Sequence, residues 1–261
     1  MMRVAAVAVA VGLLILLLLP FQIVALLLKL PARRTIPILL HRAVCRLLGV
    51  RINLLGTFAS GPVLIVANHV SWLDICVITS IAPVVFIAKR EVSTWPIFGL
   101  LARLQRSVFI DRTRRSATVA ANRTIGERLA DGDRVVLFAE GTSSDGNRVL
   151  PFRSSLLAAV EMAAGKTAPG DIAIQPAAIA YTAGNGVPLG RRHRPRVAWY
   201  GDLDLLPHLA AIIRRGAVDV TISAGEPIRA DAVVDRKATA RDLEAQVRHL
   251  MVTALRGAPA E

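Results

Sequence analysis

VLIVANHVSWLD, residues 63–74, runs from five consecutive apolar residues into a short polar turn and then toward a helix. An uninterrupted apolar run of this length is typical of a strand covered on both faces. Polar residues directly after such a strand lie where α/β folds expose reactive side chains. His69 and Asp74 are therefore candidate functional residues.

The same alternation of strand and helix continues on both sides of this stretch. We expect strands at 52–57, 63–68, 84–89, 107–111, 134–140, 172–182, 196–201 and 218–225. We expect helices near 72–81, 96–104, 117–130, 154–164, 206–215 and 238–255. The segment Thr182–Arg196 is rich in Gly, Pro and Arg and is expected to form a surface loop. The pattern predicts an α/β fold with a mixed sheet flanked by helices.

The N-terminal segment is long and apolar enough to anchor the chain in a membrane. No charged residue occurs from Val4 to Leu28, which exceeds the roughly 20 apolar residues that cross a bilayer. Proline removes a helix hydrogen bond, so Pro20 leaves both a spanning helix and a hairpin open. A cleaved signal peptide is the alternative, but the run is longer than a usual signal-peptide core and no small-x-small site precedes its basic flank.

Basic residues follow the apolar segment. The 261 residues carry a formal net charge of +13, and no acidic residue precedes Asp74. A second amphipathic segment includes Arg42, Arg46 and Arg51, which suit the phosphates of an anionic membrane surface. A helix that simply faces the core is the alternative. We expect residues 1–51 to form a membrane-anchoring helical segment, with one domain at 52–256 and a frayed tail at 257–261.

His69 and Asp74 have the chemistry of a general base and its orienting carboxylate. A neutral imidazole accepts a proton from an attacking hydroxyl when a carboxylate binds its other ring nitrogen. The structural alternative is a capping box, in which Asp74 answers the backbone of Ser71 at a helix start, and one residue can do both. No serine lies in a G-x-S-x-G elbow, so the sequence offers no obvious nucleophile for a covalent acyl-enzyme.

NHVSWLD, residues 68–74, resembles the N-H-x4-D signature of the 1-acylglycerol-3-phosphate O-acyltransferase family, the lysophospholipid acyltransferases. Three further blocks match that family in order: Lys89, Glu91, Pro96 and Gly99 with Phe109-Ile110-Asp111-Arg112, then FAEGT at 138–142, and a weaker QPAAI at 175–179. The blocks span nearly half of the chain. Four ordered blocks are far more specific than one His/Asp pair.

The resemblance implies that His69 is the general base, that Asp74 orients it, and that residues 52–256 form an acyltransferase domain. It places substrate contacts at Asn68, Ser71, Lys89, Arg112, Glu140, Gly141, Thr142 and Arg153. Backbone donors near 140–142 are expected to stabilise an oxyanion or bind the head group. Lys89 and Arg112 are expected to meet an anionic head group.

The implied reaction moves a fatty acyl group from an acyl carrier protein or coenzyme A thioester to the free hydroxyl of a lysolipid. It requires no metal or redox cofactor. The expected partners are the lysolipid acceptor, the thioester donor and anionic membrane lipids. The expected location is the bacterial inner membrane, with the catalytic domain on the cytoplasmic side.

Two departures from the family pattern concern the acceptor. Ala139 replaces the proline usual in F-P-E-G-T, and Ser143 stands where the family usually has arginine. The arginines that remain for phosphate contact are Arg112, Arg148 and Arg153. EGTSSDGNRVLPFRSS, residues 140–155, is similar to the lyso-ornithine lipid acyltransferases, whose acceptor head group is an amino acid. We expect lysophosphatidate as acceptor, giving phosphatidate, with lyso-ornithine lipid, giving ornithine lipid, as a nearly equal alternative.

Two other classes of protein compete with this interpretation. A noncatalytic basic protein would bind membranes or nucleic acid through charge alone, but the apolar N-terminal segment and the scarcity of aromatic residues argue against nucleic acid. A thioesterase or lipid hydrolase would use the same base to activate water. Release of free fatty acid without lysolipid distinguishes that class.

Overall fold

The computed structural model describes residues 1–110, 115–157, 172–230, 233 and 235–257. Its strands are β1 (Val50–Leu55), β2 (Val63–Ala67), β3 (Val84–Lys89), β4 (Val108–Ile110), β5 (Arg134–Phe138), β6 (Ala173–Gly184), β7 (Val187–Pro188), β8 (Val218–Ala224) and β9 (Ile228–Arg229). Its α-helices are α1 (Met2–Leu27), α2 (Ala32–Leu48), α3 (Leu73–Ile81), α4 (Phe98–Leu104), α5 (Arg115–Ala130), α7 (Leu205–Arg215) and α8 (Arg236–Arg256). Short 3₁₀ helices are η1 (Arg90–Thr94), η2 (Ser154–Leu157) and η3 (Arg194–Arg196).

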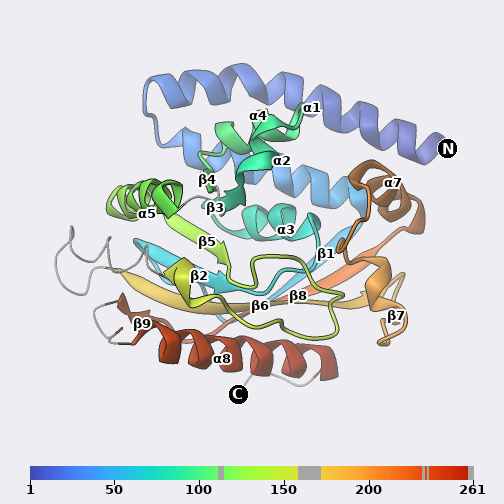
Figure 1. Cartoon of the computed structure of the whole chain (residues 1–261). Helices are drawn as coiled ribbons and strands as arrows, with labels where there is room; N and C mark the ends of the chain where they lie inside the picture. Colours follow the sequence, from blue (N-terminus) through green and yellow to red (C-terminus); the bar gives the residue numbers. More distant parts are fainter. Residues whose placement is uncertain (111–114, 158–171, 231–232, 234, 258–261) are drawn as a thin grey trace.

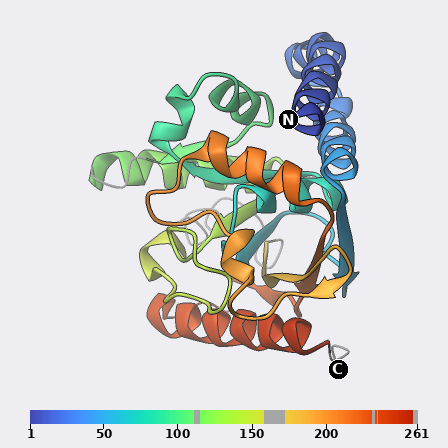
Figure 2. The same cartoon turned by 90° about the vertical axis from the view of Figure 1, so that its right-hand side faces the viewer.

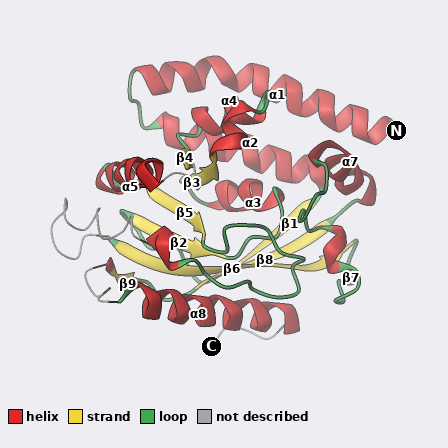
Figure 3. Cartoon of the chain, viewed as in Figure 1, coloured by secondary structure: helices red, strands yellow, loops and turns green. Residues whose placement is uncertain are grey.

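The strands form one mixed sheet, which confirms the predicted α/β class (Figure 3). The strand order is β1-β8-β6-β2-β5-β3-β4, and β7 and β9 pair with β6. The central strand β2 is parallel to both of its neighbours, β5 and β6. The β6–β8 pair is antiparallel. The carboxyl ends of β2 and β5 therefore meet at the same edge of the sheet.

Both faces of the sheet are covered, which explains the uninterrupted apolar run of β2. Val63, Ile65 and Ala67 pack in the cluster that contains residues of α2, α3 and α7. Leu64 and Val66 pack on the opposite side, in the cluster that contains residues of α5 and α8. In Figure 1, α1, α2 and α3 are stacked above the sheet and α8 lies below it.

The two N-terminal helices form a hairpin on one side of the domain (Figure 2). Helix α1 is continuous through Pro20, and the chain turns at Leu28–Pro31 before α2 begins. The buried Gln22 side chain donates from Nε2 to the carbonyls of Leu104 (2.8 Å) and Arg33 (3.2 Å). Helix α1 is long and apolar enough to cross a membrane, and almost none of its apolar core segment is buried. The hairpin is therefore joined to the domain on one side and presents an apolar surface on the other.

Two of the three arginines expected to face lipid phosphates are engaged within the protein. Arg42 donates to the carbonyl of Ser80 at 2.7 Å. Arg51 pairs with Asp219 on the neighbouring strand β8. Arg46 remains exposed on α2. The amphipathic pattern of α2 thus reflects packing between α1 and α3 as well as its basic charge.

The strand expected at 196–201 is wrong. The segment forms the end of η3 and an irregular stretch. The Trp199 amide makes one hydrogen bond, to the carbonyl of Val70, and is not part of a ladder of paired strand residues. The expected loop at 182–196 also holds the end of β6 and the short β7. The helix expected at 154–164 begins as η2, and residues 158–164 lie outside the described part of the chain.

Candidate active site

The site forms where β2 and β5 end beside each other. Asn68 and His69 follow β2, and Ala139 and Glu140 follow β5. The amide of Ala139 donates to the carbonyl of Ala67 at 3.2 Å, which continues the pairing of the two strands for one further residue. The two loops that follow are thus held side by side.

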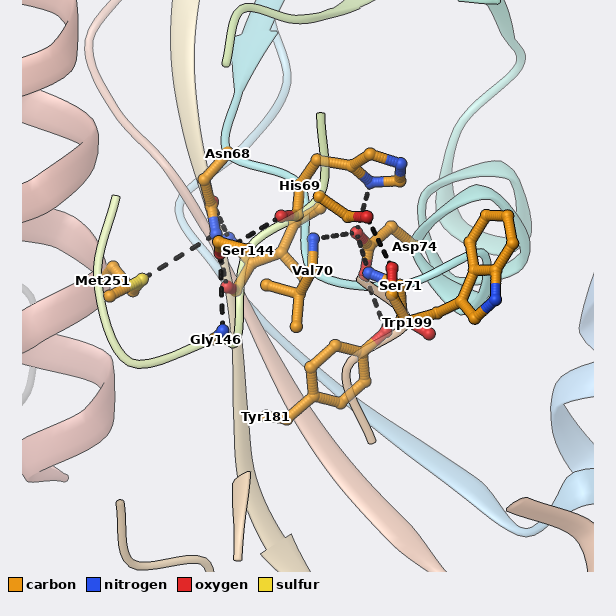
Figure 4. Close-up of polar contacts among 12 residues, drawn as sticks. Asn68, His69, Val70, Ser71, Asp74, Ser144, Gly146, Tyr181, Trp199 and Met251 are labelled. Atoms are coloured by element: carbon orange, nitrogen blue, oxygen red, sulfur yellow. Dashed lines mark hydrogen bonds and ion pairs between the residues drawn. The ribbon is translucent and has the colours of Figure 1, made fainter. Parts of the chain in front are cut away.

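His69 and Asp74 face each other across the turn that joins β2 to α3 (Figure 4). His69 Nδ1 lies 2.8 Å from Asp74 Oδ2. The His69 side chain is 18% exposed, whereas the Asp74 side chain is fully buried. The contact uses Nδ1, so the opposite ring nitrogen, Nε2, points away from Asp74. The arrangement has the geometry of an imidazole base oriented by a carboxylate.

Asp74 accepts hydrogen bonds from several donors besides His69. Oδ2 accepts from the amides of Val70 (2.7 Å) and Ser71 (2.9 Å), and Oδ1 accepts from the hydroxyl of Tyr181 (2.7 Å). Burying an ionised carboxylate costs on the order of several kcal/mol unless such donors compensate for its lost hydration. The bond from the Ser71 amide is one half of the expected capping box. The other half is absent, because the buried Ser71 hydroxyl has no hydrogen-bonding partner among the described residues.

An aromatic residue fixes the plane of the imidazole. The rings of His69 and Phe138 are stacked, with centroids 4.0 Å apart and planes 12° from parallel. Phe86 on β3 stacks in turn on Phe138, at 5.9 Å. The His69 carbonyl also accepts from the Ser144 amide at 2.8 Å, which ties the loop after β5 to the backbone of His69.

The FAEGT block contributes a buried acid and a tight turn. Burial raises the pKa of Glu140 to about 8, although the nearby amides of Leu150 and His69 act in the opposite direction. Neither carboxyl oxygen of Glu140 has a well-formed hydrogen bond with the described residues. Gly141 has a positive φ of 73°, and its amide donates to the Phe138 carbonyl. That amide, one of the three expected oxyanion donors, is thus used within the turn, whereas Thr142 is exposed.

The other expected substrate-binding residues differ in burial. Asn68 is fully buried, and its amide group exchanges two hydrogen bonds with the backbone of Ile179 on β6. Asn68 therefore joins strands, and Ser71 is likewise fully buried. Lys89, at the end of β3, and Arg153 are exposed. Arg112 lies outside the described residues.

Trp199 links the two loops of the site from a segment far along the chain. Its amide donates to the Val70 carbonyl at 2.9 Å, and its carbonyl accepts from the Ser143 hydroxyl. Its ring meets that of Trp95 edge to face, with centroids 6.1 Å apart. The Ser143 side chain is therefore committed to an internal contact at the position where the family usually has arginine.

Sequence reasoning missed three contributors to this site: Tyr181, Phe138 and Trp199. Tyr181 carried the clearest signal, because a tyrosine inside an apolar strand needs a partner for its hydroxyl. The strand period of two places it on the same face of β6 as Ile179, and both belong to the cluster that contains α3. Nothing in the local pattern near Trp199 indicated its contacts, since they depend on the path of a loop.

Comparisons with known proteins identify the family of this chain. A model of the Acyltransferase family matches residues 49–180. The chain is 49% identical to a lyso-ornithine lipid O-acyltransferase from Brucella abortus, over 92% of this chain and 90% of that protein. It is 47% identical to a lyso-ornithine lipid O-acyltransferase from Rhizobium meliloti, over 93% of this chain and 83% of that protein.

A solved structure shares the fold. The 1-acyl-sn-glycerophosphate acyltransferase from Thermotoga maritima aligns with a TM-score of 0.60, over 88% of this chain and 83% of that chain. The sequence identity is 22%, so the likeness concerns the arrangement of strands and helices.

Proposed function

Because this chain belongs to the Acyltransferase family, we propose that it moves a fatty acyl group from a thioester donor to the free hydroxyl of lyso-ornithine lipid. Membership confirms the family expected from the four sequence blocks. The observation that carries the choice of acceptor is the near full-length similarity to the two relatives named for it. Ser143 agrees with this choice, because its hydroxyl binds the Trp199 carbonyl where a phosphate-binding arginine would otherwise stand.

In the proposed mechanism, His69 is the general base and Asp74 its orienting partner. His69 Nε2 takes the proton of the lysolipid hydroxyl as that oxygen attacks the thioester carbonyl carbon. The resulting tetrahedral intermediate collapses with cleavage of the carbon–sulfur bond. The imidazolium then returns the proton to the leaving thiolate, which gives an ester and a free thiol. Asp74 stabilises the imidazolium through the 2.8 Å contact with Nδ1.

The apolar and basic surface of the chain supports a proposal about its location and partners. We infer that α1 and α2 attach the enzyme to the bacterial inner membrane, with the domain on the cytoplasmic side beside the lysolipid and its donor. Exposed side chains along α1, such as Leu13, Leu16 and Leu17, support this placement. The donor is a thioester of acyl carrier protein or coenzyme A. The exposed Lys89 and Arg153 are candidates for the carboxylate of the ornithine head group.

Removing the base tests this proposal. The purified full-length chain in vesicles is assayed with lyso-ornithine lipid and lysophosphatidate, using each type of thioester donor. The wild type is expected to form ornithine lipid, and His69→Ala to lower the rate by roughly 10²–10⁴ because proton removal is lost. His193→Ala, at an exposed position, serves as the matched control and should keep wild-type activity.

Three results would contradict the proposal. Near-normal turnover by a folded His69→Ala protein would exclude His69 as the base. Release of free fatty acid in the absence of lysolipid would indicate a hydrolase. A clear preference for lysophosphatidate would replace lyso-ornithine lipid with the second candidate acceptor.

A further inference from the structure

Tyr181 reaches the active site because β6 is longer than its parallel neighbour β2. The last paired residues of the two strands are Ala67 and Ala177. Tyr181 lies four residues beyond Ala177 on β6, level with the turn that carries His69 and leads to Asp74. Its side chain is fully buried, and its hydroxyl lies 2.7 Å from Asp74 Oδ1 (Figure 4).

Packing alone does not explain why residue 181 carries a hydroxyl. The ring lies in an apolar cluster with Ile179, Val77 and Ile78, where a phenylalanine would fit equally well. A buried hydroxyl is costly unless it is hydrogen-bonded. Burial and the negative charge of Asp74 raise the pKa of Tyr181 well above its usual value, so the phenol keeps its proton and donates to the carboxylate.

Different groups bind the two carboxylate oxygens of Asp74. Oδ2 accepts from the Val70 and Ser71 amides and contacts His69 Nδ1. Oδ1 accepts from Tyr181. The amides fix one oxygen, and the phenol fixes the other from the opposite side of the carboxylate. Rotation of the carboxylate about its bond to Cβ would break contacts at both oxygens.

We propose that Tyr181 is a positioning residue for acyl transfer, holding Asp74 Oδ1 so that Oδ2 stays aligned with His69 Nδ1 throughout proton transfer. This rests on the proposed function, in which His69 is the base. The phenol also withdraws negative charge from Asp74, which limits how strongly the carboxylate holds the proton on the imidazolium.

Three titratable groups packed near the dyad, Cys45, Cys76 and Glu140, are uncharged on the acid side of the pH profile. Burial raises the pKa of Cys45 to about 11 and that of Cys76 well above its usual value, so both thiols stay neutral. Glu140, on the β5 side, has a pKa of about 8 and affects only the alkaline part of a pH profile. These three groups therefore do not contribute to the acid limb of kcat/KM.

Tyr181→Phe tests the proposal by removing only the hydroxyl. We expect kcat to fall roughly tenfold with little change in KM, since one hydrogen bond to a charged group is lost. The carboxylate becomes more basic, so the imidazolium holds its proton more tightly. The acid limb of the pH–rate profile should move to higher pH by roughly half a unit or more. Tyr200→Phe, which changes the exposed second tyrosine, should leave both properties unchanged.

Fluorotyrosine at position 181 gives a second test, in which the acid limb should move in the opposite direction. The chain has only two tyrosines, so growth of the Tyr200→Phe variant on 3-fluorotyrosine places the label at Tyr181 alone. The more acidic phenol is a stronger donor, so the acid limb should move to lower pH while the fold is preserved. A purely structural role would lower the midpoint of thermal unfolding in Tyr181→Phe and leave the acid limb in place in both proteins.

The outcomes also separate this inference from the proposed mechanism. If His69→Ala and Asp74→Asn stay active, the dyad mechanism itself is wrong. If those variants are inactive while Tyr181→Phe keeps the wild-type kcat and acid limb, only the positioning role of Tyr181 is overturned.

Discussion

Ser143 stands where the family usually has arginine, and its side chain makes a hydrogen bond inside the protein. Its hydroxyl donates to the Trp199 carbonyl, and the Trp199 amide donates to the Val70 carbonyl. The loop after β5 is thereby joined, through Trp199, to the turn that carries His69. An arginine at this position carries its donors at the end of a long side chain and has no hydroxyl to place against the Trp199 carbonyl. Its guanidinium would turn toward solvent or the substrate and leave the Trp199 carbonyl without this donor.

Ser143→Arg is therefore expected to reverse the acceptor preference. Activity on lyso-ornithine lipid should fall by roughly tenfold, the size of one lost hydrogen bond, while activity on lysophosphatidate rises through a charge-assisted phosphate contact. The measurement is kcat/KM for both lipids. Ser143→Thr keeps a hydroxyl and is the matched control. Equal losses on both lipids would show that Ser143 supports the loop without affecting specificity.

At the scale of elements, the N-terminal hairpin combines a packed side with an apolar exposed side. Gln22 bonds across to the end of α4 and to the start of α2. Arg34 on α2 pairs with the buried Asp133, in the turn that precedes β5. Leu13, Leu16 and Leu17 of α1 are each more than half exposed. The hairpin is thus positioned by polar contacts to the domain, and its exposed leucines form the apolar surface that we propose contacts lipid.

Removing residues 1–28 should weaken membrane attachment and make it salt-sensitive, because only the basic charge of the remaining chain would bind anionic lipid. Co-sedimentation with anionic vesicles at low and high salt measures this. The truncation also uncovers the packed side of α2, so a second variant changes only Leu13, Leu16 and Leu17 to serine. Salt-resistant binding by both proteins would show that another part of the chain is the anchor.

For the whole molecule, two buried groups make stability depend on pH in opposite directions. Burial raises the pKa of Glu140 from 4.5 to about 8, so its contribution is fully present below pH 4.5 and is lost as the pH rises through 8. Burial lowers the pKa of His41 from 6.5 to about 4, so its contribution is fully present above pH 6.5 and is lost as the pH falls through 4. Of these two groups, only Glu140 changes the stability of the protein between pH 6.5 and 8.

Glu140→Gln should remove this alkaline loss of stability. Between pH 6.5 and 8 we expect the free energy of unfolding of the wild type to fall by about 1–2 kcal/mol because Glu140 ionises. The free energy of unfolding of the variant should not show this fall. Denaturant unfolding in detergent at the two pH values measures the difference. Glu226→Gln, at an exposed position, should retain the wild-type slope. A wild type equally stable at both values would mean that Glu140 is already ionised in the folded protein.

The parts of this protein that the sequence determines are those encoded locally. An apolar run bounded by polar residues specifies β2, and the spacing of NHVSWLD brings His69 and Asp74 together within one turn. The α/β class and the bilayer-length helix follow from the same short-range patterns, because side-chain period and segment length are properties of neighbouring residues.

Only the tertiary structure decided which distant residues complete the site. Tyr181 contacts Asp74 because β6 pairs in parallel with β2 and extends past it. Phe138 stacks on His69 because β5 lies on the other side of β2. The error in the strand expected at 196–201 has the same origin. This apolar segment forms a loop in which Trp199 contacts the loops after β2 and β5. Strand order and register join residues far apart in the chain, and the periodicity of a single segment contains no information about which segment becomes its neighbour.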